Sequence, residues 1–152
     1  MIVYADASAL VKRYVMEAGS NEVIGLTSAA VAVATALVSR AEVAAAFARA
    51  VRRGVLDEVS GRRAQRSFAR EWPDFARIAV TEALAARAEV LAWEFGLRGY
   101  DAIQLAAALT WRESVGRDVV LATFDRQLWQ AGPQVGLGIW PKQSPGRRIA
   151  VR

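Results

Sequence analysis

The first residues of the chain place a strand-like run directly before a carboxylate and a helix. Residues 2–5 are apolar at every position, which is typical of a strand buried on both faces of a parallel sheet. Asp6 follows at once, and apolar residues recur at helical spacing from Ser8 onward. In an open α/β sheet, ligands bind outside the carboxyl ends of the strands. Asp6 is therefore predicted to lie where chemistry takes place.

Strand-like and helical patterns alternate along the rest of the chain. Short apolar or β-branched runs predict further strands at residues 31–36, 75–80, 119–122 and 137–140. Helical periodicity predicts helices from Ser8 to just before Gly19 and at residues 21–29, 37–53, 57–70, 81–95, 100–114 and 125–131. The alternation predicts the α/β class, a parallel, doubly wound sheet with helices on both faces.

The length of the chain, 152 residues, fits one domain with a core of its own. No internal repeat or linker divides it, so we expect residues 1–141 to form a single domain. Pro141 and the Pro145-Gly146 pair then open a basic segment, and we expect residues 142–152 to be a flexible tail.

The sequence contains neither cysteine nor histidine. The lack of cysteine excludes disulfides, thiol catalysis and zinc–thiolate sites. The lack of histidine excludes Ser-His-Asp chemistry and imidazole bases. Any acid–base or metal chemistry has to use carboxylates.

The net charge is +5 and the isoelectric point is near 10.4. A group of acids within a basic surface suits a metal-dependent enzyme that acts on a polyanion. An arginine-rich genomic composition is the alternative explanation for this charge.

Neither a signal peptide nor a membrane span is visible. Asp6 comes too early for a signal peptide, and residues 29–38, the most apolar segment, are too short to cross a bilayer. We expect a cytoplasmic protein that does not enter a membrane.

Four carboxylates stand out, and three of them fall at strand ends or helix starts that such a sheet brings to one edge. Asp6 follows the first strand, Glu42 lies in the helix after the second, Asp101 opens the most apolar helix, and Asp125 follows the fourth strand. Three of them have a simpler explanation on their own, because Asp101 and Asp125 can cap helices and Glu42 can be solvated, whereas Asp6 is harder to explain in such a way. Together the acids repel one another unless a cation joins them, and oxygen ligands select Mg²⁺ or Mn²⁺. Such a site suits hydrolysis of phosphodiesters.

The segments around these acids also carry a family resemblance. Residues 3–12, 40–43, 97–106 and 122–125 resemble, in order and spacing, the motifs of PIN-domain ribonucleases. The toxin half of VapBC-type toxin–antitoxin pairs is the nearest match, and the resemblance runs from residue 2 to residue 140. It implies a three-layer α/β/α sandwich with a central parallel sheet and a Mg²⁺-dependent endoribonuclease site.

The resemblance also implies roles for individual residues. By match, Asp6 and Asp101 are the principal metal ligands, with Mn²⁺ as a possible substitute for Mg²⁺. Glu42 and Asp125 complete the cluster, directly or through water. These four acids are accordingly the expected catalytic residues.

Several neighbours of the acids are expected to assist them. Ser8 and Thr123 match hydroxyl residues near the metal, although both can instead bind local backbone. Lys12 and Arg98 are candidates for contacting RNA phosphates. Gln104 departs from the family, in which many members have histidine there, and this affects the expected positioning of the substrate.

Family members commonly dimerise and are typically inhibited by a small antitoxin that wraps the toxin. We therefore expect an RNA substrate, a cognate antitoxin and a homodimer. One alternative is a PIN-like module that binds RNA or protein without cleaving, although such a module has no use for four repelling acids. A phosphatase with Asp6 as nucleophile is the other. Haloacid-dehalogenase-like phosphatases generally have a second aspartate two positions later, where this chain has Ser8.

Overall fold

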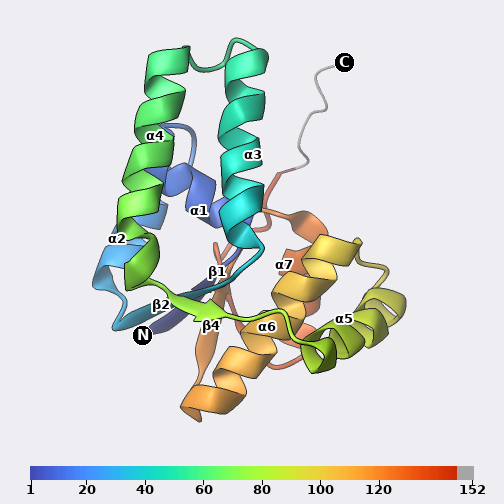
Figure 1. Ribbon diagram of the computed structural model, residues 1–152. Helices are drawn as coiled ribbons and strands as arrows, with labels where there is room; N and C mark the ends of the chain where they lie inside the picture. The colour runs from blue at the N-terminus through green and yellow to red at the C-terminus, as the bar shows by residue number, and fades with distance from the viewer. Residues whose placement is uncertain (147–152) are drawn as a thin grey trace.

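The computed structural model describes residues 1–146 and is built around a five-stranded sheet (Figure 1). Its strands are β1 (Ile2–Ala5), β2 (Ala32–Ala36), β3 (Ala76–Ile78), β4 (Val119–Ala122) and β5 (Gly138–Trp140). They are ordered β3-β2-β1-β4-β5, and every neighbouring pair is parallel. The first strand of the chain is thus the central one, and its carboxyl end lies in the middle of the sheet edge.

Helices cover both faces of the sheet. They are α1 (Ala7–Tyr14), α2 (Ser20–Ala29), α3 (Ser39–Arg52), α4 (Glu58–Glu71), the short 3-10 helix η1 (Trp72–Asp74), α5 (Glu82–Phe95), α6 (Gly99–Val115) and α7 (Arg126–Gln134). Buried residues of α1 to α4 pack with one face, and those of α5 to α7 pack with the other. The predicted three-layer α/β/α architecture with a parallel sheet is confirmed.

The central strand explains why the layers form. Side chains alternate between the faces of a strand, so Ile2 and Tyr4 join the core under α5 to α7, while Val3 and Ala5 join the core under α1 to α4. All four are buried. An uninterrupted apolar run is what a strand covered on both faces requires.

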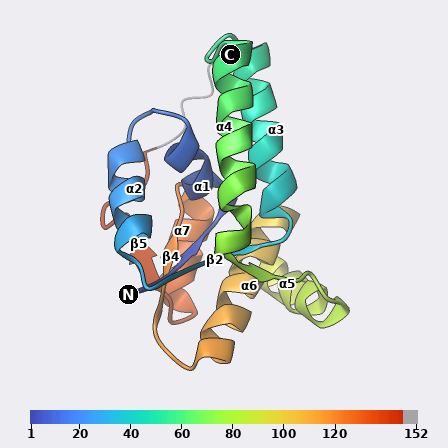
Figure 2. The ribbon, with the colours of Figure 1, turned by 60° about the vertical axis from the view of Figure 1, so that its left-hand side comes forward.

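Helices α3 and α4 form a long hairpin that rises beyond the sheet (Figures 1 and 2). Aromatic rings pack the base of the hairpin against α1. Phe68 of α4 packs edge-on against Tyr14 of α1 and Trp72 of η1, with ring centroids 5.4 Å apart in both pairs. Edge-to-face pairs of this kind add to the free energy gained from burying the rings. The hairpin base, from which Glu42 projects, is therefore firmly packed.

Two helix ends differ from the prediction. Helix α1 stops at Tyr14 instead of running to Gly19, because buried Val15 is extended and its carbonyl accepts a hydrogen bond from the Ser20 hydroxyl. Helix α7 continues through Pro133 to Gln134, where the sequence predicted an end at residue 131. Its Ala131 and Gly132 are buried against the sheet, and this packing outweighs the backbone hydrogen bond that proline removes.

The predicted tail at residues 142–152 lies largely outside the described residues, which end at 146. Within residues 1–146, no helix combines the length and the apolarity that crossing a bilayer would require.

Candidate active site

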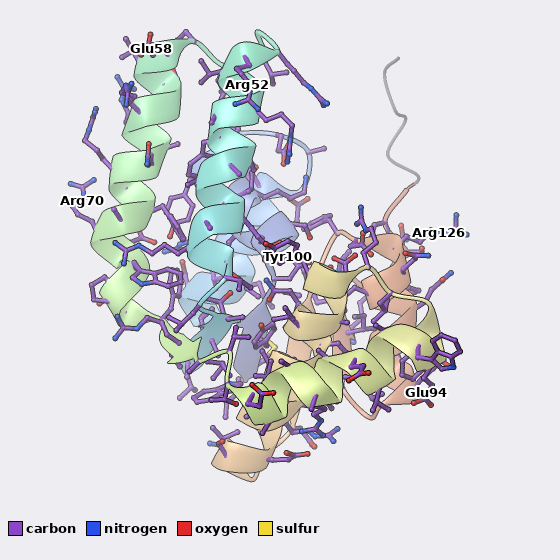
Figure 3. The ribbon with its side chains drawn as sticks, turned by 45° about the vertical axis from the view of Figure 1, so that its right-hand side comes forward. Arg52, Glu58, Arg70, Glu94, Tyr100 and Arg126 are labelled. Atoms are coloured by element: carbon purple, nitrogen blue, oxygen red, sulfur yellow. The ribbon has the colours of Figure 1, made fainter. Side chains whose placement is uncertain are left out.

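The four predicted acids come from elements that meet near one edge of the sheet. Asp6 directly follows β1, and Asp125 lies just beyond β4. Glu42 and Asp101 lie in the first turns of α3 and α6. Figure 3 shows Tyr100, the neighbour of Asp101, at the end of α6 that faces the lower turns of α3.

Asp6 is held from both sides by short hydrogen bonds and is only 3% exposed. Its Oδ1 accepts from the Ser8 hydroxyl at 2.7 Å and from the backbone N–H of Ala9 at 2.9 Å. Its Oδ2 accepts from the Thr123 hydroxyl at 2.8 Å. Asp6 therefore caps α1 and is also tied to the end of β4.

The two hydroxyl residues also bind backbone, which was the alternative explanation for them. Ser8 Oγ accepts from the N–H of Phe124 at 2.8 Å, and Thr123 Oγ1 accepts from the N–H of Asp125 at 3.0 Å. Ser8 and Thr123 thus join the ends of β1 and β4 and fix the direction of the Asp6 carboxylate between them.

Burial gives Asp6 an unusual proton affinity. Its pKa is raised from 3.8 to about 6; loss of solvent is the largest cause, and the charge of Asp101 contributes to the rise. The hydrogen bonds from Ser8, Ala9 and Thr123 oppose this rise because they favour the charged form. A buried carboxylate of this kind gains from a nearby cation.

Glu42 is not the solvated helix glutamate that its sequence position allows. Its Oε1 accepts a 2.7 Å hydrogen bond from Nε2 of Gln104 on α6. Burial raises its pKa from 4.5 to about 7, and the charges of Asp6 and Asp101 contribute to the rise. These mutual effects place Asp6, Glu42 and Asp101 in one electrostatic cluster.

Asp101 and Asp125 share a single arginine. Nε of Arg98 donates to Oδ2 of Asp101, and Nη2 of Arg98 donates to Oδ2 of Asp125, each at 2.9 Å. The arginine side chain is 74% exposed, whereas the two aspartates are 14% and 22% exposed. Arg98 therefore lies across the rim of the acidic cluster.

The capping explanations for these two aspartates have opposite outcomes. Asp125 does cap α7, because its Oδ1 accepts from the N–H of Leu128 at 2.9 Å. The explanation of Asp101 as a helix cap is wrong, because α6 begins at Gly99 and Arg98 occupies the capping position.

Lys12, a predicted contact for RNA phosphates, binds several groups within the protein. Its Nζ donates to the carbonyl of Ala18 at 2.7 Å and to Oε1 of Glu17 at 3.0 Å, and lies 4.4 Å from the ring centroid of Phe124. Its side chain is 14% exposed. The amine holds the α1–α2 connection beside the site.

The donor set fits a hard divalent cation. It consists of oxygen atoms, which Mg²⁺ and Mn²⁺ prefer. Three protein hydrogen bonds reach Asp6, and an ionised carboxylate offers about four acceptor positions, so one remains on Oδ2. Among residues 1–146, no three acidic side chains are placed to hold one ion together. Mg²⁺ usually takes one or two carboxylates and keeps its waters, which this spacing allows.

Comparison with known proteins decides the family. No family model matches the chain. It is, however, 34% identical over 143 residues to ribonuclease VapC45 of Mycobacterium tuberculosis strain CDC 1551 / Oshkosh and, equally, to ribonuclease VapC49 of strain ATCC 25618 / H37Rv. Each alignment covers 93% of this chain and 96% of the relative. The chain belongs to the VapC ribonuclease family.

Solved structures agree with this VapC fold. A toxin–antitoxin complex from Klebsiella pneumoniae matches with a TM-score of 0.64 at 18% identity, over 93% of this chain and 98% of that one. VapBC2 from Rickettsia felis bound to a promoter DNA fragment matches with a TM-score of 0.62 at 12% identity, over 91% and 97%. The predictions of a PIN-like fold and of a VapC ribonuclease toxin are thus confirmed.

Sequence reasoning missed the contacts of two residues of this VapC site. For Gln104 the sequence indicates an effect on the positioning of the substrate but does not reveal that the side chain is buried and donates to Glu42. Tyr4 was assigned only to the apolar strand, yet its hydroxyl donates to Oε1 of Gln104 at 2.6 Å. A hydroxyl two residues before Asp6 was the available signal, but its partner lies 100 positions away.

Proposed function

We propose that this VapC ribonuclease hydrolyses RNA phosphodiester bonds at the acidic cluster with the help of Mg²⁺, for which Mn²⁺ can substitute. Asp6 and Asp101 hold the ion, and Glu42 and Asp125 complete the site directly or through water. The observation that carries the proposal is the electrostatic coupling of buried Asp6 with Glu42 and Asp101. Burying acids that repel one another costs free energy, and a bound cation would offset this cost. The cluster therefore favours a metal-dependent enzyme over a non-catalytic module or a phosphatase.

The residues of the chain have distinct roles in this proposal. When bound, the ion lowers the pKa of a water and stabilises charge on the reacting oxygens. Ser8 and Thr123 hold the Asp6 carboxylate in one direction through the bonds described above. Arg98 offers an exposed guanidinium at the rim for an RNA phosphate, since arginine binds such groups through several N–H donors. Lys12 adds positive charge nearby.

The partners form part of the same proposal. We infer that a small antitoxin inhibits this chain, because two structures with its fold are a toxin–antitoxin complex and VapBC2. A homodimer, a cytoplasmic location and a nuclease domain confined to residues 1–141 also remain proposals. The family membership supports the first two.

Cleavage of total cellular RNA by purified protein tests the function. Discrete products are expected with Mg²⁺ or Mn²⁺, and none with EDTA or with the Asp101→Asn variant. Asp118→Asn is the matched control, because this exposed aspartate precedes β4 at the opposite edge of the sheet.

Two outcomes would contradict the proposal. Cleavage that persists in EDTA would refute the metal dependence. Full activity of Asp101→Asn would refute the assignment of the active site to the acidic cluster. A folded protein that binds RNA without cutting it, after any co-purified antitoxin has been removed, would favour the binding module.

A further inference from the structure

A chain of buried hydrogen bonds runs from the central strand to Glu42. Tyr4 on β1 donates from its hydroxyl to Oε1 of Gln104 on α6 at 2.6 Å. Nε2 of Gln104 then donates to Oε1 of Glu42 at 2.7 Å and to Oγ of Ser39 at 2.9 Å, both on α3. Tyr4 and Gln104 are 0% and 1% exposed. Three separate layers of the fold therefore meet at one amide.

The chemistry of the partners fixes the orientation of this amide. An ionised carboxylate only accepts hydrogen bonds, so the NH₂ group of Gln104 has to face Glu42. Its oxygen then faces Tyr4, whose phenol can donate. Both ends of the amide are satisfied in this orientation, whereas a rotated amide would set two acceptors against each other. Glu42 thus selects the orientation of the amide, and Tyr4 stabilises it by donating to the amide oxygen.

The position of Gln104 on α6 connects this network to the rest of the site. Gln104 lies three residues after Asp101, and residues with this spacing share one face of a helix. The turn of α6 that presents Asp101 to the cluster therefore also holds Glu42 of α3. Satisfied networks of buried polar groups are rigid, because breaking one bond leaves a polar group unpaired. The distance between α3 and α6 is fixed at the point where the acids meet.

We propose that Gln104 is a positioning residue of the ribonuclease, whose amide, held by Tyr4, keeps the Glu42 carboxylate beside Asp6 and Asp101. The inference rests on the proposed function, in which Glu42 belongs to the acidic cluster. It adds two buried residues that do not touch the RNA and that act only through Glu42.

Single variants give the first test. Gln104→Met keeps the length of the side chain but removes the amide, and Tyr4→Phe removes one hydroxyl. We expect kcat to fall by about 10–100-fold in Gln104→Met, the loss typical when a group that orients a metal-site residue is removed. A smaller loss is expected in Tyr4→Phe, and the KM for RNA stays unchanged in both. Binding of Mn²⁺, measured by electron paramagnetic resonance without RNA, weakens in the same order.

Thr27→Val is the matched control for these losses. It also removes one buried hydroxyl, which donates to the carbonyl of Val23 at 2.8 Å in α2 and lies outside the acidic cluster. It is expected to lower the melting temperature as Tyr4→Phe does but to keep the wild-type kcat. Gln104→His, which returns an N–H donor, is expected to recover part of the kcat lost in Gln104→Met.

Double variants test whether the effect passes through Glu42. In the Glu42→Gln background, Gln104→Met is expected to cause no further loss of kcat, and Tyr4→Phe no further loss in the Gln104→Met background. Losses that multiply instead would overturn the proposal, as would single variants no worse than Thr27→Val. Full activity of Glu42→Gln would refute the proposed site itself. A kcat that falls in Glu42→Gln but not in Gln104→Met refutes only the positioning role.

Discussion

Nη2 of Arg98 and Oδ2 of Asp125 lie 2.9 Å apart although the residues are separated by 27 positions in the chain. The same guanidinium donates through Nε to Asp101, so one side chain links the starts of α6 and α7. A single cation thereby offsets the repulsion between two acids at the rim. Since the side chain is largely exposed, the guanidinium also remains accessible to a phosphate from solvent.

Arg98→Ala should weaken RNA cleavage much more than it weakens the fold. Exposed ion pairs contribute about 0–1 kcal/mol, so the free energy of unfolding should change little. A lost hydrogen bond to a charged group costs about 1.5–3 kcal/mol, which corresponds to a rise of roughly tenfold or more in the KM for RNA. Steady-state cleavage and urea unfolding measure the two effects.

Arg62→Ala is the control for this prediction, because Arg62 is also exposed and is also held in an ion pair, with Glu58 in the hairpin. It should leave KM unchanged. Equal KM values for Arg98→Ala and the wild type would show that Arg98 does not contact the substrate.

The metal-free protein should lose the stability contributed by its buried acids as the pH rises. Asp6 and Glu42 have folded-state pKa values of about 6 and about 7, above their ordinary values of 3.8 and 4.5. The folded state therefore binds these protons more tightly than the unfolded state. The resulting stability is fully present below about pH 4 and is lost as the pH passes through 6 to 7. For Asp6 the shift corresponds to about 3 kcal/mol.

Melting curves in EDTA from pH 4 to pH 8 test this. The melting temperature of Asp6→Asn, relative to the wild type, should rise across the window, because asparagine has no charge to bury and still caps a helix. Glu42→Gln should behave in the same direction, and Asp118→Asn should show no such trend. A constant difference between Asp6→Asn and wild type at every pH would contradict the raised pKa.

The order of the elements could be predicted because each carries a local signal. Asp57 and Thr81 accept hydrogen bonds from Ser60 and Leu84, as capping residues before helical patterns should. The apolar run at residues 2–5 predicted a strand covered on both faces. Such signals lie within a few residues of the element that they specify, so a single sequence is enough to find them.

The environment of the acids could not be predicted in the same way. Aspartate is common both at a helix cap and inside a first turn, so the pattern around Asp101 did not distinguish the two. Glu42 has the spacing of a solvated helix residue, and only the folded chain brings the amide of Gln104 on α6 to its carboxylate. The contact between Tyr4 and Gln104 joins residues 100 positions apart. Its existence depends on the complete fold.

Divalent cations should stabilise the protein through binding to the folded state alone. At a free concentration of 100 times Kd, binding adds about 2.7 kcal/mol to the free energy of unfolding. Mn²⁺ titrations followed by melting temperature should show this rise in the wild type. The rise should be absent in Asp6→Asn and Asp101→Asn, which remove the proposed ligands, and present in Asp118→Asn. A response of equal size in all four proteins would show that the ions bind elsewhere.

Gly61 of α4 lies against Val51 of α3, and its substitution should destabilise the hairpin. A Cβ at this position would collide with Cγ2 of Val51. Alanine is worth about 1 kcal/mol more than glycine in a helix, but overpacking costs about 1–3 kcal/mol, so Gly61→Ala should lower the free energy of unfolding.

Gly25→Ala provides the matched control, because this glycine lies in α2 and no atom beyond its chain neighbours and the backbone of its own helix comes within 4 Å of the added Cβ. It should stabilise the protein by up to about 1 kcal/mol. Adding Val51→Ala to Gly61→Ala should recover stability relative to Gly61→Ala alone, since the smaller side chain makes room for the new methyl group. Urea unfolding of the four proteins measures these differences. If Gly61→Ala were as stabilising as Gly25→Ala, the two helices would not be in contact at this point.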